Sequence, residues 1–101
     1  MPSSAKEAPL HPGQILLRSY LRPLGIRQME LADHIGLEPA ELSRFVNGKR
    51  ELSARLAWSL SAALGTPPRF WMLRQVDFDL WRDRPKRRLK RMKAAARAAS
   101  R

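Results

Sequence analysis

The stretch QMELADHIGLEPAELSRFVN, residues 28–47, decides the fold of this chain. Its apolar residues recur at the spacing of two short helices, expected from about Arg27 to His34 and from Pro39 to Asn47. Gly36 lies between them, at a turn whose positive φ favours glycine. The residues that would press the two helices together are Leu31, Ala32, Ile35, Leu37, Leu42 and Phe45. We predict a helix-turn-helix, whose second helix can enter a major groove while the first crosses the backbone.

Three further helices are expected around this pair. The first opens at His11-Pro12-Gly13, because proline suits the first helical turn, and ends at Pro23 and Gly25. The fourth begins after the N-cap Ser53 and ends at Gly65, and the fifth runs from about Pro68 to Trp81. The predicted inward stripe of the first helix is Leu17, Tyr20, Leu21 and Leu24. No strand-like alternation occurs, so the predicted fold class is all-α, with five short helices.

The chain is short and its positive charge is uneven. It has 101 residues and a formal net charge of +11, which suits one domain and a polyanionic partner. Residues 1–81 carry a net charge of only +2, whereas residues 82–101 carry +9. We therefore divide the chain into a flexible lead-in (1–9), a helix-turn-helix domain (10–81) and a basic tail (82–101) that is flexible or helical.

The composition excludes most catalytic chemistry. The chain has no cysteine, and its two histidines, His11 and His34, lack a metal-binding spacing. His11 is expected to order the start of the first helix, and His34 to lie on a helix surface. Asp77 and Asp79 are two positions apart and cannot act as a pair. We predict no enzyme activity, no cofactor and no metal. Since no apolar run approaches the ~20 residues of a membrane span, we expect no membrane partner and a cytoplasmic, nucleoid-associated protein.

Several short motifs resemble one known family. They are His11-Pro12-Gly13, Leu24-Gly25-Ile26, Asn47-Gly48-Lys49-Arg50, the run from Leu64 to Trp71, and Asp79-Leu80-Trp81. Over Leu10 to Trp81 the chain resembles the HigA-type antitoxins, of the Cro/repressor-like (Xre) helix-turn-helix superfamily. The resemblance implies a homodimer that binds operator DNA, represses its own operon and neutralises a small, mRNA-cleaving HigB-type toxin.

The resemblance also implies DNA-contacting residues. Ser43, Arg44 and Asn47 would reach base edges or phosphates from the second helix of the motif, where arginine suits guanine. Gln28, Lys49 and Arg50 would contact phosphates. The chain departs from many relatives at Glu38 and Glu41, which replace Ser or Thr near the start of the second helix. Carboxylates suit a helix N-terminus, so a capping role is expected, but they repel phosphates.

The tail and two tryptophans complete the candidate surfaces. Non-specific DNA contacts are expected from Arg84, Lys86, Arg87, Arg88, Lys90 and Arg91. Leu89, Met92, Ala96 and Ala99 lie at helical spacing, so the tail from Lys86 onward can fold as a helix on an acidic partner. Trp58 and Trp81 are the candidates for a dimer or toxin interface, whereas Phe70 and Trp71 are expected in the core.

Other interpretations stay open at this point. The two central helices can be a corner in a helical domain without a DNA-binding role. The protein can also be a free-standing regulator without a toxin, or a nucleic-acid binder that works mainly through its tail.

Overall fold

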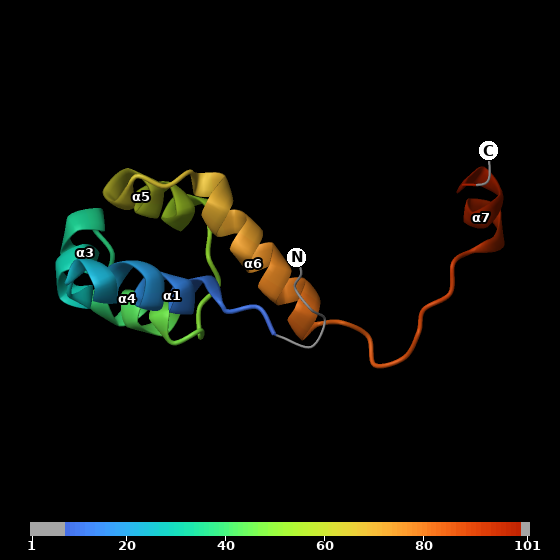
Figure 1. Cartoon of the computed structure of the whole chain (residues 1–101), viewed down its shortest axis with the longest axis horizontal. Coiled ribbons are helices and arrows are strands. Elements are labelled where there is room, and N and C mark those ends of the chain that lie inside the picture. The colour runs from blue at the N-terminus through green and yellow to red at the C-terminus, as the bar shows by residue number, and fades with distance from the viewer. Residues whose placement is uncertain (1–7, 100–101) are drawn as a thin grey trace.

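A computed structural model describes residues 8–99, and every regular element in that range is helical. α1 (Pro12–Ile15), the π-helical turn η1 (Leu16–Leu21) and α2 (Arg22–Leu24) run on as one continuous helix. They are followed by α3 (Gln28–Ile35), α4 (Pro39–Val46), α5 (Ala54–Leu64), α6 (Pro68–Arg82) and α7 (Lys93–Ala99) (Figure 1). The predicted body of five helices is confirmed, and α7 lies outside it.

The core joins all five helices of the body. Trp71 of α6 is fully buried, and its indole N–H donates to the Thr66 hydroxyl at 2.7 Å, so its polar edge is satisfied. Phe70 packs on the edge of this core, as expected. The other buried apolar residues are Leu16, Leu21, Leu31, Ala32, Leu42, Phe45, Val46, Leu52, Leu56, Ala57 and Leu60.

The π-helical turn changes which face of the first helix is inside. The N–H of Arg22 donates to the carbonyl of Leu17, five residues back, so the helical phase slips. Leu16 and Leu21 are buried as a result, whereas Leu24 is 62% exposed. The expected burial of Leu24 is therefore wrong. Pro23 does not end the helix either, which continues to Leu24 and ends at Gly25, with φ 68°.

α1 lies unusually close to α4. A Cβ atom on Gly13 would lie 1.7 Å from the carbonyl oxygen of Phe45, so only glycine fits this crossing. His11 orders the start of the helix, as expected, because its Nδ1 accepts a hydrogen bond from the N–H of Gly13 at 2.9 Å. The Gln14 amide also donates to the carbonyl of Val46. The sequence motif His-Pro-Gly thus attaches the first helix to the end of α4.

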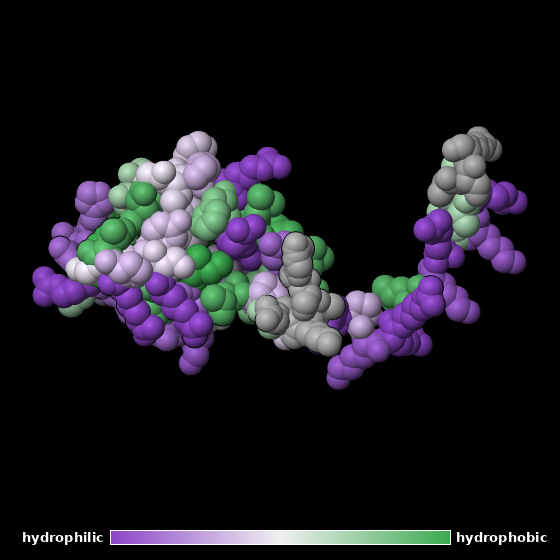
Figure 2. Space-filling view, in the orientation of Figure 1, coloured by the Kyte–Doolittle hydropathy of each residue, from purple (hydrophilic) through white to green (hydrophobic). Residues whose placement is uncertain are grey.

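The tail leaves the body at the end of α6. In Figure 1 it extends away from the five helices, and Figure 2 shows mostly hydrophilic residues along it. In the chain without a partner the described tail from Lys86 onward is helical only in α7, from Lys93, and residues 86–92 form no helix. Leu89 and Met92 are exposed, so they find no apolar surface against which a longer helix would be stable. Within residues 8–99, no helix is long and apolar enough to cross a membrane.

Candidate nucleic-acid interface

The outer face of α4 carries polar side chains over a completely buried inner face. Leu42, Phe45 and Val46 are almost fully buried and fix the orientation of the helix. Arg44 and Asn47 are exposed on the opposite side, and Ser43 is half-buried beside them. The structure therefore brings together the three predicted base-reading residues on one surface.

Two of these side chains are held by hydrogen bonds. The guanidinium of Arg44 donates to the carbonyl of Lys49 at 3.1 Å. The Asn47 amide donates to the carbonyl of Ser43 at 2.8 Å. In return, the N–H of Lys49 donates to the carbonyl of Arg44 at 2.8 Å, so α4 and the following loop are joined twice. Side chains held in this way lose less conformational entropy when they bind a ligand.

The loop after α4 places the two predicted phosphate contacts differently. Lys49 is exposed, whereas the Arg50 side chain is only 27% exposed and lies 3.6 Å from the carboxylate of Glu41. One Arg50 nitrogen, Nη1, is shielded from solvent and has no hydrogen-bond partner among the described residues. Arg50 therefore partly neutralises Glu41, a carboxylate that would otherwise repel a phosphate.

The first residues of α3 and α4 make fewer side-chain hydrogen bonds than expected. Gln28 is half-buried at the first position of α3, and no hydrogen bond of its side chain is seen among residues 8–99. Glu38 is the N-cap residue of α4, but its carboxylate makes no capping hydrogen bond. The expected capping role of Glu38 is therefore wrong, since its side chain accepts no N–H group of the first turn.

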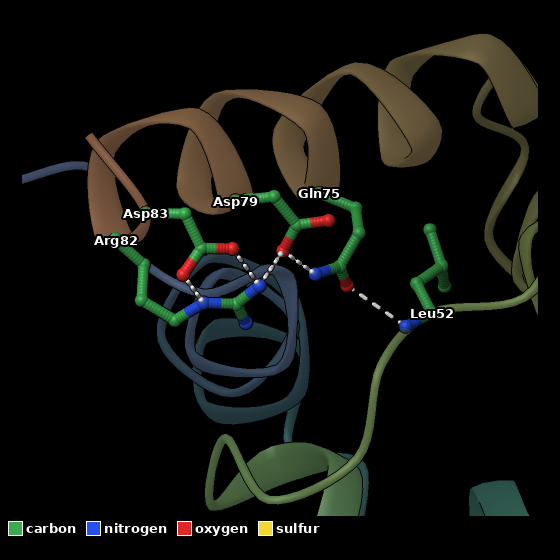
Figure 3. A network of polar contacts seen from close by, with 5 residues as sticks. All are labelled: Leu52, Gln75, Asp79, Arg82 and Asp83. Carbon is green, nitrogen blue, oxygen red and sulfur yellow. Dashed lines mark hydrogen bonds and ion pairs between the residues drawn. The ribbon is translucent and has the colours of Figure 1, made fainter. Parts of the chain in front are cut away.

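A polar network ties the same loop to α6 (Figure 3). Gln75 is 5% exposed, and its Oε1 accepts a hydrogen bond from the backbone N–H of Leu52 at 2.8 Å. Its Nε2 donates to Asp79 at 2.8 Å, and Asp79 lies 3.4 Å from Arg82. Arg82 binds Asp83 through two hydrogen bonds, which lower the pKa of the Asp83 carboxyl. The sequence reading missed Gln75, although a polar residue on the inward stripe of Trp71 was the available signal.

His11 lies where the loop, α4 and α6 meet. Its ring makes T-shaped contacts with Phe45 on α4 and Phe78 on α6, with centroids 5.6 and 5.0 Å away. Burial lowers the pKa of His11, and together with the positive charge of Arg82 it outweighs the opposite influence of the Arg50 backbone and of the Asp79 and Glu51 carboxylates. The neutral imidazole is therefore the form that fits this junction. His34 is exposed on α3, as expected.

Among the described residues of the tail, the basic side chains that contact the body lie at its start, at Arg82 and Arg84. Arg84 donates to the carbonyl of Trp81 at 2.6 Å and stacks over its ring, 4.2 Å from the centroid, just beyond the end of α6. The next basic residues are exposed and make no side-chain hydrogen bond or ion pair with any described residue. They are Lys86, Arg87, Arg88, Lys90 and Arg91.

The outer faces of α5 and α6 carry exposed apolar side chains. Trp58 on α5 is 65% exposed, and Leu73, Val76 and Leu80 form a stripe on the side of α6 that faces away from the core. Trp81 is half-buried under Arg84. An apolar area of this kind is typical of a protein–protein interface. Across the described range, no group of His, Asp and Glu side chains is placed to hold a metal ion.

Comparison with known proteins identifies the arrangement of α3 and α4. A helix-turn-helix family model matches residues 17–71. The chain belongs to this helix-turn-helix family. The membership confirms the predicted motif and fold class, and the family comprises DNA-binding regulators and not enzymes.

Similar proteins of known name support this family assignment. The virulence-associated protein A' of Dichelobacter nodosus is 44% identical over 73 residues, which cover 71% of this chain and 63% of that protein. The antitoxin HigA-1 of Vibrio cholerae is 38% identical over 76 residues, which cover 75% of this chain and 71% of the relative. The solved structure of Pseudomonas aeruginosa antitoxin HigA with the higBA promoter superposes with a TM-score of 0.69. It is 28% identical, and the match covers 91% of this chain and 86% of that one. The resemblance to HigA-type antitoxins is therefore confirmed.

Proposed function

We propose that this protein is a sequence-specific, DNA-binding repressor that also acts as an antitoxin. The observation that carries the proposal is the outer face of α4, where Arg44 and Asn47 are exposed and already held by hydrogen bonds. Arginine can bind guanine through two hydrogen bonds, and asparagine can bind adenine in the same way. The HigA structure that includes promoter DNA supports the same use of the fold.

The DNA-binding proposal is tested with a duplex that the unmodified chain selects from a randomised pool. Replacing Arg44 with alanine is expected to weaken binding to this duplex by about tenfold to a hundredfold, since one bidentate base contact is worth ~1–3 kcal/mol. Binding to an unselected duplex should change little. Arg69→Ala is the matched control, because Arg69 is an exposed arginine at the start of α6. Equal losses for the two variants would contradict base reading by Arg44.

The repressor is proposed to act as a homodimer, because two copies of α4 can then read two half-sites about one DNA turn apart. The exposed stripe of α6 and the exposed Trp58 supply apolar area for this contact, and the half-buried Trp81 lies at the end of the same helix. Trp58→Ala and Trp81→Ala are expected to weaken self-association, measured by sedimentation, more than they lower the melting temperature. A large fall in melting temperature at equal dimer affinity would assign the two side chains to the body of the monomer.

The partner of the antitoxin is proposed to be a small, mRNA-cleaving toxin of the HigB type. The support is the relative named antitoxin HigA-1. A short reading frame beside the gene, co-expressed with this chain, should yield a co-purifying complex and lose its toxicity. If no neighbouring product is toxic, the alternative of a free-standing regulator is correct.

The tail, residues 82–101, is proposed to add non-specific attraction for DNA, which would place the protein on the nucleoid in the cytoplasm. Its support is the net charge of +9, with few of those cations engaged by the body. Footprinting distinguishes sequence-specific binding by α4 from non-specific binding by the tail. A short palindromic site indicates readout by α4, whereas continuous protection indicates a binder that works mainly through its tail.

A further inference from the structure

The loop from Asn47 to Ser53 is held from three directions. Arg44 binds it from α4, through the backbone N–H and carbonyl of Lys49. The His11 imidazole, at the start of α1, packs beside Gly48 of the loop, since a Cβ built on Gly48 would lie 3.7 Å from its Cγ. Gln75 reaches it from α6 and accepts the N–H of Leu52. A loop outside a helix or sheet depends on such contacts for a defined shape, and this one carries Lys49 and Arg50.

The Gln75 side chain is buried, and its amide bridges α6 and the loop. It is buried in α6, on the same inward stripe as the fully buried Trp71, four residues earlier. Its oxygen accepts from the loop and its nitrogen donates to Asp79 on its own helix, so both ends of the amide are used (Figure 3). A buried amide that is satisfied on both sides fixes the distance between the two elements it joins.

We propose that Gln75 is a positioning residue for DNA binding, which holds the loop with Lys49 and Arg50 in register with α6. The inference rests on the proposed DNA-binding function and names a residue that does not itself touch DNA. The helix that carries Gln75 also carries the exposed stripe of Leu73, Val76 and Leu80. The inner side of α6 thus sets the loop, while its outer side offers the surface for a second copy.

Gln75→Met tests the proposal, because methionine has a similar length and no hydrogen-bonding amide. Amide exchange at Leu52 is expected to rise about a hundredfold in the free protein, since its buried N–H loses its acceptor. Affinity for the selected duplex should fall about tenfold, and the slope of log K against log salt should flatten by about one unit through loss of a phosphate contact. Affinity for an unselected duplex should change less than about twofold, because the tail dominates there.

Asp79→Ala is the matched control. It removes the far end of the network but leaves the bond from Leu52 to Gln75, so amide exchange at Leu52 and duplex affinity should stay near the values of the unmodified chain. If Gln75→Met lowers helical content, the milder Gln75→Asn replaces it, because the shorter amide stays polar but does not reach the loop.

Each outcome decides the matter. Faster exchange at Leu52 with unchanged affinity overturns the proposal, since the bond would then be structural only. Weaker binding without faster exchange, or an equal loss in Asp79→Ala, also overturns it. If the unmodified chain selects no duplex at all, the DNA-binding function itself fails, and the positioning role fails with it.

Discussion

Two arginines of the motif, Arg44 and Arg50, and the cations of residues 86–91 in the tail differ in how they are held. In the body, Arg44 is bound to the loop carbonyl of Lys49, and Arg50 lies against Glu41. In the tail, residues 86–91 hold five cations that contact no other described residue through a hydrogen bond or ion pair. The body is nearly neutral, whereas the tail carries a net charge of +9.

This difference separates two contributions to binding. Charges that the fold places can distinguish one base sequence from another, because a bidentate contact depends on direction as well as distance. Charges that the fold does not place add an attraction that every phosphate backbone satisfies equally. The residues from Glu38 to Asn47 carry one arginine and two glutamates. The outer face of α4 therefore contributes selectivity but little electrostatic affinity, whereas the tail contributes affinity but no selectivity.

The largest effect is expected from a substitution that disrupts the packing of the body and leaves the tail unchanged. Gly13→Ala places a Cβ against the backbone carbonyl of Phe45, and neither backbone can move without separating α1 from α4. We expect a loss of at least ~3 kcal/mol in the free energy of unfolding, measured by thermal melting with circular dichroism. The variant should lose its preference for the selected duplex but still bind DNA at low salt through the tail.

Gly65→Ala is the control for that prediction. Gly65 has φ 75° at the end of α5, and nothing lies within 4 Å of an added Cβ. Its cost should be only ~1 kcal/mol, from backbone conformation alone. Equal losses for the two variants would show that the crossing of α1 and α4 is looser than the structure indicates.

Removal of the tail is expected to have the next largest effect. A chain that ends at Asp83 keeps all of α6 but loses residues 84–101. The slope of log K against log salt should flatten by roughly 3–5 units, because each phosphate contact contributes about 0.9. The ratio of affinities for selected and unselected duplexes should rise. Fluorescence titration at several salt concentrations measures both quantities, and an unchanged slope would contradict a role of the tail in binding.

The body of the fold is largely readable from its sequence, because its signals are local. Ser53 caps α5 by accepting the N–H of Leu56, and Gly36 and Gly65 take positive φ where helices end. Proline opens α4 and α6 at the expected positions. Each of these features depends on a few neighbouring residues. The slip of helical phase at η1 instead depends on how the first helix packs against the rest of the body. This slip leaves Leu24 exposed, where the sequence predicted it to be buried.

The candidate site was harder to predict for a related reason. The positions of Ser43, Arg44 and Asn47 follow from the helical period of α4 alone. The restraint of Arg50 by Glu41, and of Leu52 by Gln75, joins residues 9 and 23 positions apart. Helical periodicity contains no information about such pairs. A polar residue on a predicted buried stripe is the one local sign that a distant partner exists.

The smallest expected effect is a change of the free energy of unfolding with pH, which should affect the body and not the tail. Because burial lowers the pKa of His11, the unfolded chain takes up a proton there more readily than the native state. The free energy of unfolding should therefore be constant above about pH 7, fall as the pH drops below about 6.5, and level off once native His11 is also protonated. Protonation would also abolish the acceptor for the N–H of Gly13.

Thermal melts between about pH 5 and pH 8 measure this effect. His11→Gln should flatten the dependence, whereas His34→Gln, at an exposed histidine of α3, should leave it intact. Residues 82–101 contain no histidine, so the salt slope that the tail contributes should not change over the same range. A salt slope that changes together with body stability would mean that the tail depends on the fold for its contacts with DNA. The two regions would then act as one binding surface, and the contrast between placed and unplaced charges would not hold.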